Sequence, residues 1–198
     1  MPRTVNLEAR HRILDAAHRL FYTSGLNAVS MDSVAVAAGI KKANLFHYYP
    51  TKESLELAVL DRAAASMKEH IARVARHSFD PVGGIQRIFE EAADLMRQSH
   101  CSGGCFFGNL AQEVADGNEP IRQKVAEHLD AWTLELAAFF ERWRRTGYFR
   151  EDFQPHVAAQ AILSLLEGAL LFCKASKSPA PVESAKHLAV SYLEAIRA

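Results

Sequence analysis

Apolar residues recur along most of this chain at the three-to-four-residue spacing of amphipathic helices, and no segment alternates convincingly with period two. Glycine and proline cluster at the breaks between these periodic segments. The pattern therefore predicts an all-α fold of about nine helices. The expected helices cover residues 7–24, 30–38, 42–48, 51–77, 84–99, 105–115, 120–146 and 155–175, and a last one that follows a loop over residues 178–181 and reaches Ile196.

Two short helices joined by a glycine are predicted within residues 30–52. Ser30 is a good N-cap for the first helix, and Gly39 gives the turn the backbone freedom that it requires. The second helix, from about Lys42 to Tyr48, is dense in lysine, asparagine, histidine and tyrosine, and Pro50 stops it. This arrangement is typical of a helix-turn-helix, whose second helix enters the major groove of DNA.

The charge of the chain is unevenly distributed. Its formal net charge is +0, but residues 1–55 hold 7 Lys or Arg against 4 Asp or Glu, and the remainder holds 16 against 19. The positive excess therefore accompanies the predicted helix-turn-helix, where phosphates would attract it. An excess of this size supports a nucleic-acid interface.

Residues 10–60 resemble the TetR family of bacterial transcriptional regulators. The resemblance rests on Ala16-Ala17, Leu20-Phe21, Gly25, the segment from Ser30, and Phe46-His47-Tyr48-Tyr49-Pro50-Thr51-Lys52-Glu53. It implies a three-helix DNA-binding head over residues 1–52 and a larger helical body over residues 53–198 for effector binding and dimerisation. It also implies a ligand-responsive regulator, a repressor released from a palindromic operator by a small molecule.

Roles in DNA binding follow from the residue types together with this resemblance. Leu45 and Phe46 should face the core of the head, and small or apolar residues should line the helix crossing at Ala35, Ala38 and Ile40. Lysine can donate to guanine edges or phosphates, asparagine can read adenine, and a tyrosine hydroxyl can donate to a phosphate. In the family the position of Lys42 lies near the groove, that of Tyr48 contacts a phosphate, and that of Lys52 clamps the DNA backbone. The candidate DNA-binding residues are Ser30, Lys41, Lys42, Asn44, His47, Tyr48 and Lys52.

A homodimer is expected because one recognition helix buries too little surface for specific binding, whereas two can read a palindrome. The helix over residues 155–175 is apolar nearly all round, with one stripe through Leu163 and Leu166 and another through Ile162 and Phe172. The last helix adds Leu188, Tyr192 and Ile196. A core helix of a monomer would show the same pattern.

The residues that would hold an effector are harder to identify, because most large side chains of the body should be ordinary core. Asn109 and Glu113 lie one helical turn apart, as do Cys105 and Asn109, so they could form an inward polar stripe. Glu167 lies midway along an otherwise apolar helix. The candidate effector-binding residues are Cys105, Asn109, Glu113, Trp132 and Glu167.

The three cysteines, Cys101, Cys105 and Cys173, cannot all pair within one chain, so we expect free thiols in a reducing cytoplasm. Cys105 lies near a predicted helix N-terminus, which should lower its thiol pKa. An alternative function is therefore thiol or electrophile sensing by Cys105, with Cys101 on a flexible loop as the resolving thiol. Their spacing is not that of a zinc site, so we expect no metal and no cofactor.

Other classes of protein fit the sequence less well. Recognisable catalytic motifs are missing, which argues against a helical enzyme. A ligand-free DNA-architectural protein is typically more basic throughout. The apolar stretch from Ala158 to Cys173 looks too short to span a membrane, so the expected partners are duplex DNA, a small-molecule effector and a second copy of the chain.

Overall fold

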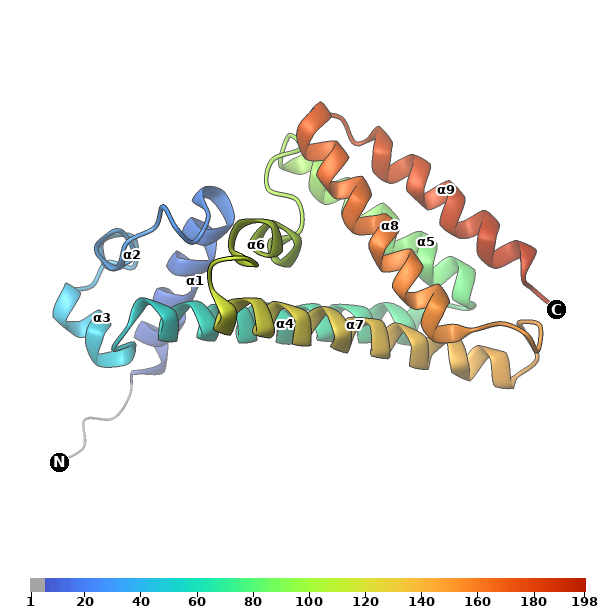
Figure 1. Cartoon of the computed structure of the whole chain (residues 1–198), viewed down its shortest axis with the longest axis horizontal. Helices are drawn as coiled ribbons and strands as arrows, with labels where there is room; N and C mark the ends of the chain where they lie inside the picture. The colour runs from blue at the N-terminus through green and yellow to red at the C-terminus, as the bar shows by residue number, and fades with distance from the viewer. Residues whose placement is uncertain (1–5) are drawn as a thin grey trace. The chain divides into compact units, whose positions relative to one another are not determined.

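The structure is a computed structural model that describes residues 6–198, apart from the side chains of residues 75 and 76. Over this part of the chain there are nine α-helices (Figure 1), which confirms the all-α prediction. They are α1 (Leu7–Ser24), α2 (Met31–Ala37), α3 (Lys42–Tyr48), α4 (Lys52–His77), α5 (Pro81–Gln98), α6 (Phe106–Val114), α7 (Glu119–Arg145), α8 (Pro155–Ser176) and α9 (Ala180–Ala195).

The chain packs as two compact units. The first runs to Ala65 and also contains Asn109–Ala126, and the second contains Ser66–Gly108 and Glu127–Ala198. Helices α4, α6 and α7 therefore contribute residues to both units. The functional domain boundary that we expect after residue 52 stays a prediction, and residues 1–5 of that expected domain lie outside the described residues.

The first unit has a small apolar core to which every helix of the head contributes. Ile13 of α1, Leu45 of α3 and Leu55 of α4 are each 0% exposed. Asn6 begins α1 by accepting a hydrogen bond from Ala9 N at 3.1 Å. Gly25 ends α1 with a φ of 81°, a conformation that costs glycine little. Within this unit α1 packs against α2, and α2 packs against α3.

The second unit is built around α5, α8 and α9, which pack against one another (Figure 1). Its core includes an aromatic cluster in which Phe140 meets both Phe149 and Phe153 edge-on. Phe149 also forms an isolated antiparallel bridge with Arg197, so the C-terminus is tied to the turn after α7. Aromatic burial of this extent makes a stable support for α8 and α9.

Two expectations need correction, one about where a helix begins and one about the length of an apolar helix. Helix α5 begins at Pro81 and not at residue 84 as expected, because Asp80 caps it by accepting from Gly83 N at 2.8 Å. Helix α8 is 22 residues long and is the one described helix that is long and apolar enough to cross a membrane. One such helix is weak evidence for a span, and six of its residues are buried in the protein, including Ala158, Ile162 and Cys173.

Candidate nucleic-acid interface and effector site

Helix α2 begins with a reciprocal cap. Ser30 Oγ accepts a hydrogen bond from Ser33 N at 3.1 Å, and Ser33 Oγ accepts one from Ser30 N at 3.1 Å. The two serines thereby satisfy backbone donors that a helix N-terminus leaves free. The predicted cap at Ser30 is confirmed, and both serines are exposed on the head.

The turn between α2 and α3 is closed by backbone hydrogen bonds from Gly39 N to Val36 O and from Ile40 N to Ala35 O. Gly39 has a φ of 66°, as the predicted turn requires. Ala35 and Ala38 are buried at 3% and 6% exposure, and Ile40 is half-buried. The expected close crossing of the two helices is therefore present.

Helix α3 is anchored by Leu45 and by Tyr49, which follows it. Leu45 is 0% exposed and Tyr49 is 5% exposed, with the Tyr49 hydroxyl accepting from Arg10 Nε at 3.3 Å. The expectation that Phe46 faces the core is wrong, because its side chain is 38% exposed and lies 5.9 Å from the Lys42 ammonium. Tyr49 occupies the core beside Leu45, since residues four apart share a helical face.

The remaining side chains of this helix point away from the core. Asn44 and His47 are exposed, Tyr48 is half-buried, and the His47 and Tyr48 rings meet edge-on with centroids 5.8 Å apart. Lys41 and Lys42 are also exposed, and Lys42 Nζ lies 2.7 Å from Asp32 Oδ1 of α2. The structure thus brings the predicted residues 42, 44, 47 and 48 onto one short helix and residue 41 to its N-cap, with polar groups suited to a groove. Their contacts with DNA remain a prediction.

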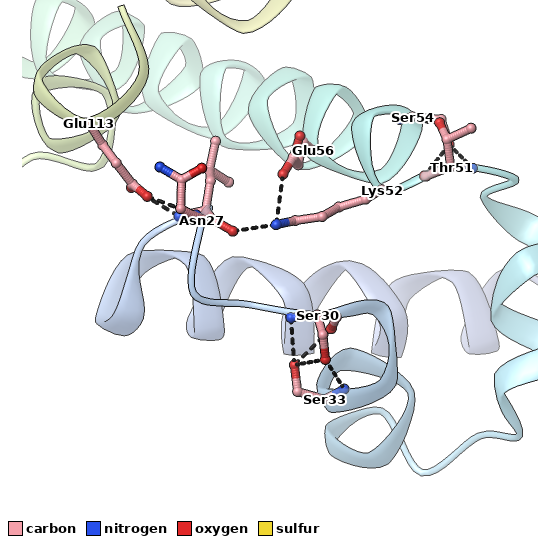
Figure 2. A network of polar contacts seen from close by, with 9 residues as sticks. Asn27, Ser30, Ser33, Thr51, Lys52, Ser54, Glu56 and Glu113 are labelled. Atoms are coloured by element: carbon pink, nitrogen blue, oxygen red, sulfur yellow. Dashed lines mark hydrogen bonds and ion pairs between the residues drawn. The ribbon is translucent and has the colours of Figure 1, made fainter. Parts of the chain in front are cut away.

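Lys52 lies differently from what a free phosphate clamp would suggest. Its ammonium donates to Leu26 O at 2.6 Å and lies 3.6 Å from Glu56 Oε1 (Figure 2). A contact with a DNA phosphate therefore competes with two partners inside the protein. Thr51 caps α4 as expected, since its Oγ1 accepts from Ser54 N at 3.0 Å.

Glu56 was not singled out from the sequence, yet it is one of the few buried charged side chains, with 6% exposure. Burial raises the pKa of its carboxyl, and the neighbouring Lys52 ammonium opposes this shift. A glutamate one turn after a lysine is common on exposed helices. The spacing alone therefore gave no sign that Lys52 of this pair donates to the Leu26 carbonyl.

In the second unit the structure brings together Cys105 and Glu167. Cys105 precedes α6, its thiol contacts the Glu167 carboxyl, and its sulfur accepts from Gly108 N at 3.5 Å. A methyl group on Gly108 would overlap Glu167 Oε2, so the glycine allows the carboxyl to approach α6. Burial raises the pKa of Glu167.

The expectation of a lowered thiol pKa at Cys105 is wrong. Burial, and secondly the nearby Glu167 carboxylate, raise the pKa of Cys105 well above its usual range, and the hydrogen bond from Gly108 N only partly offsets them. The proposed resolving thiol, Cys101, is itself buried, with 3% exposure. This environment favours the neutral thiol over the reactive thiolate.

The other effector candidates have surroundings of their own. Trp132 is 5% exposed and packs edge-on against Phe107 with centroids 4.7 Å apart. Asn109 is half-buried and belongs, like Glu113, to the first unit. The Glu113 carboxylate accepts hydrogen bonds from Leu26 N and Asn27 N in the turn after α1. Within the second unit, Cys105 and Glu167 of the predicted effector set are in direct contact.

Comparison with known proteins places both parts of the chain in one family. A family model described as bacterial regulatory proteins of the TetR family matches residues 13–59. A second model, for the C-terminal domain of tetracyclin repressor-like proteins, matches residues 81–189. The first match contains the helix-turn-helix described above, and the second contains most of α5 to α9.

Relatives and solved structures agree with these matches. The uncharacterised HTH-type transcriptional regulator YxaF of Bacillus subtilis is 26% identical over 176 residues, which cover 88% of this chain and 90% of the relative. The HTH-type transcriptional repressor NemR of Escherichia coli is 22% identical over 179 residues, with 90% of each chain covered.

Among solved structures, the reduced form of E. coli NemR has a TM-score of 0.83 at 21% identity and covers 96% of this chain and 97% of its own. A TetR transcriptional regulator from Chloroflexus aurantiacus has a TM-score of 0.85 at 24% identity, with 96% of each chain covered. The helix-turn-helix head, the helical body and both family models lead to one conclusion: this chain belongs to the TetR family of ligand-responsive, DNA-binding transcriptional regulators.

Proposed function

We propose that this protein is a homodimeric repressor that binds an inverted-repeat operator through α3 and leaves it when a small molecule binds the second unit. The observation that carries the proposal is α3 itself. Leu45 is fully buried while Lys41, Lys42, Asn44 and His47 remain exposed. A helix anchored on one face and polar on the other is suited to read base edges in a major groove.

Dimerisation is supported by the exposed apolar side chains of α8 and α9. Leu171 and Phe172 of α8 are 45% and 67% exposed, and Leu188 of α9 is 61% exposed. The opposite side of α8 is buried in the core of the second unit, so the helix is apolar on both sides. Apolar surface on adjacent helices, in a family whose members act as dimers, favours a helical interface between two copies.

The effector is proposed to act near Glu167, which combines burial with a polar group. A carboxyl beside the Cys105 thiol can form a hydrogen bond with a ligand, and such a group orients a small molecule among apolar side chains. A thiol switch at Cys105 draws no support from the local electrostatics, since the thiol pKa is raised.

The experiment that tests the central proposal is selection of binding sites from random duplex DNA with the full-length protein. We expect an inverted repeat whose half-sites lie about one helical turn, 34–36 Å, apart or a multiple of it. Recovery of no enriched site, or of a single unrepeated half-site, would contradict the proposal.

Replacements on α3 should separate base reading from phosphate contact. Asn44→Ala should cost about 1–3 kcal/mol at one base pair of each half-site and relax the preference there. Tyr48→Phe should weaken binding to all sequences alike and reduce the slope of log affinity against log salt by about 1. Fluorescence anisotropy on the selected duplex and its single-base variants, at several salt concentrations, checks both effects. An unchanged slope for Tyr48→Phe would rule out its phosphate contact.

A charge in the proposed interface should separate the two copies. Phe172→Asp would leave an unpaired carboxylate against an apolar surface, which an interface tolerates poorly. We expect light scattering to give twice the 22.0 kDa chain mass for the wild type and a single chain mass for the variant. Phe79→Asp is the matched control, because Phe79 is 100% exposed outside α8 and α9 and should not change the mass. An unchanged mass for Phe172→Asp would place the interface elsewhere.

Glu167 should make stability depend on pH in a defined direction. Its folded pKa is raised, so its favourable contribution is present below the unfolded pKa and is lost as the pH rises through the folded pKa. Glu167→Gln removes this ionisation. The melting temperature of the variant should therefore gain on that of the wild type as the pH is raised from about 4 to 8. A constant difference across that range would show that Glu167 does not titrate abnormally.

A further inference from the structure

The turn between α1 and α2 is held from two sides by charged side chains, as Figure 2 shows. On one side the Glu113 carboxylate accepts from Leu26 N at 2.9 Å and from Asn27 N at 2.8 Å. On the other side the Lys52 ammonium donates to Leu26 O at 2.6 Å, and Glu56 lies 3.6 Å from that ammonium. Both backbone groups of Leu26 are therefore bound to charged side chains, which form stronger hydrogen bonds than neutral ones.

The identity of residue 25 fits this arrangement. Gly25 has a φ of 81°, and a Cβ added there would lie 2.6 Å from Glu113 Oε2 and 2.9 Å from its Cδ. Any other residue would therefore be strained in its backbone and would also displace the carboxylate. The glycine thus leaves room for the carboxylate as well as ending the helix.

The position of Glu113 connects this turn with α6. Glu113 is in the last turn of α6, whose first residues, up to Gly108, belong to the second unit and adjoin Cys105 and Glu167. Leu110 and Val114 of the same helix are buried at 1% and 5% exposure, so α6 is firmly packed. A displacement of this short helix would carry the Glu113 carboxylate with it.

The position of the α1–α2 turn also determines where α2 begins. Only Ala28 and Val29 separate Asn27 from the Ser30 cap, and Val29 is buried at 4% exposure. Resting on the DNA-binding function proposed above, we propose that Glu113 is a positioning residue for the DNA reader. Its carboxylate holds the α1–α2 turn on α6, and operator affinity depends on that bond although Glu113 touches no DNA.

The first test measures operator affinity with the full-length protein and the duplex selected by the wild type. Glu113→Ala removes both acceptors and should weaken binding roughly tenfold or more, as expected when two charge-assisted hydrogen bonds are lost. Glu113→Gln keeps one acceptor oxygen, so its operator affinity should lie between that of the wild type and that of Glu113→Ala. The slope against salt should stay the same in both variants, because the phosphate contacts are retained.

A matched control is Glu119→Gln, which removes a carboxylate of the same unit that accepts hydrogen bonds from Arg122 and Gln123 on the exposed start of α7. It should bind DNA like the wild type. Circular dichroism at the assay temperature measures the folded fraction of each variant. A loss of operator affinity that results only from unfolding can therefore be recognised. If folded Glu113→Gln and Glu113→Ala both bind as tightly as the wild type, the proposal is wrong.

The second test needs no DNA and uses a double-mutant cycle of Gly25→Ala with Glu113→Ala. Backbone strain at the positive φ is present in both backgrounds and cancels, so the cycle isolates the contact with the carboxylate. We expect Gly25→Ala to lower the melting temperature by about 2–4 °C less when Glu113 is absent. If the decreases in melting temperature of the two single variants simply add in the double variant, the inferred contact between residue 25 and the Glu113 carboxylate is wrong. If the wild type selects no inverted repeat, the proposed DNA-binding function is wrong. The double-mutant cycle would still report on the contact, because it measures stability without DNA.

Discussion

The DNA reader depends on one packing constraint, the burial of Leu45 and Tyr49 in the core of the head. Helix α3 has seven residues, far fewer than the roughly 12–15 that an isolated helix needs in water. Its cap residue Lys41 makes no side-chain hydrogen bond to the helix end, so local interactions do little to stabilise it. The orientation of the exposed lysines, Asn44 and His47 therefore follows from how α3 packs on α2 and in the core of the head.

Glu56, which is buried, and Glu167, which is half-buried, show that the protein accommodates two glutamates in different ways. Glu56 lies beside the Lys52 ammonium, which also donates to Leu26 O, so its charge contributes to holding a turn. Glu167 contacts a thiol, which compensates a carboxylate much less than an ammonium does. Keeping the Glu167 carboxyl in this environment costs stability. That cost favours a role for Glu167 in binding over a role in packing.

Helix α8 carries apolar side chains on two opposite sides. One side contributes Ala158, Ile162 and Cys173 to the core of the second unit, and the other leaves Leu171 and Phe172 exposed. This double demand explains why the helix is apolar nearly all round, and it explains how a chain segment of a DNA-binding protein comes to resemble a membrane span in composition. The proposed homodimer would cover this exposed apolar surface with a second copy of the chain.

The sequence by itself determined the helical periodicity, the breaks at glycine and proline, the caps at Ser30 and Thr51, and the recognition helix. These are local features, since a cap or a 3.6-residue period is written within a few neighbouring residues. Tertiary structure decided which face of a short helix is buried, and it placed Tyr49 rather than Phe46 in the core. It also decided the partners of charged groups far apart in the chain: Glu113 on the turn after α1, Lys52 on Leu26, and Glu167 on Cys105, whose thiol pKa is raised where helix position alone predicted a lowered one. The reason is physical: burial and long-range hydrogen bonds depend on how helices meet in space, and the spacing of residues along one helix does not encode that.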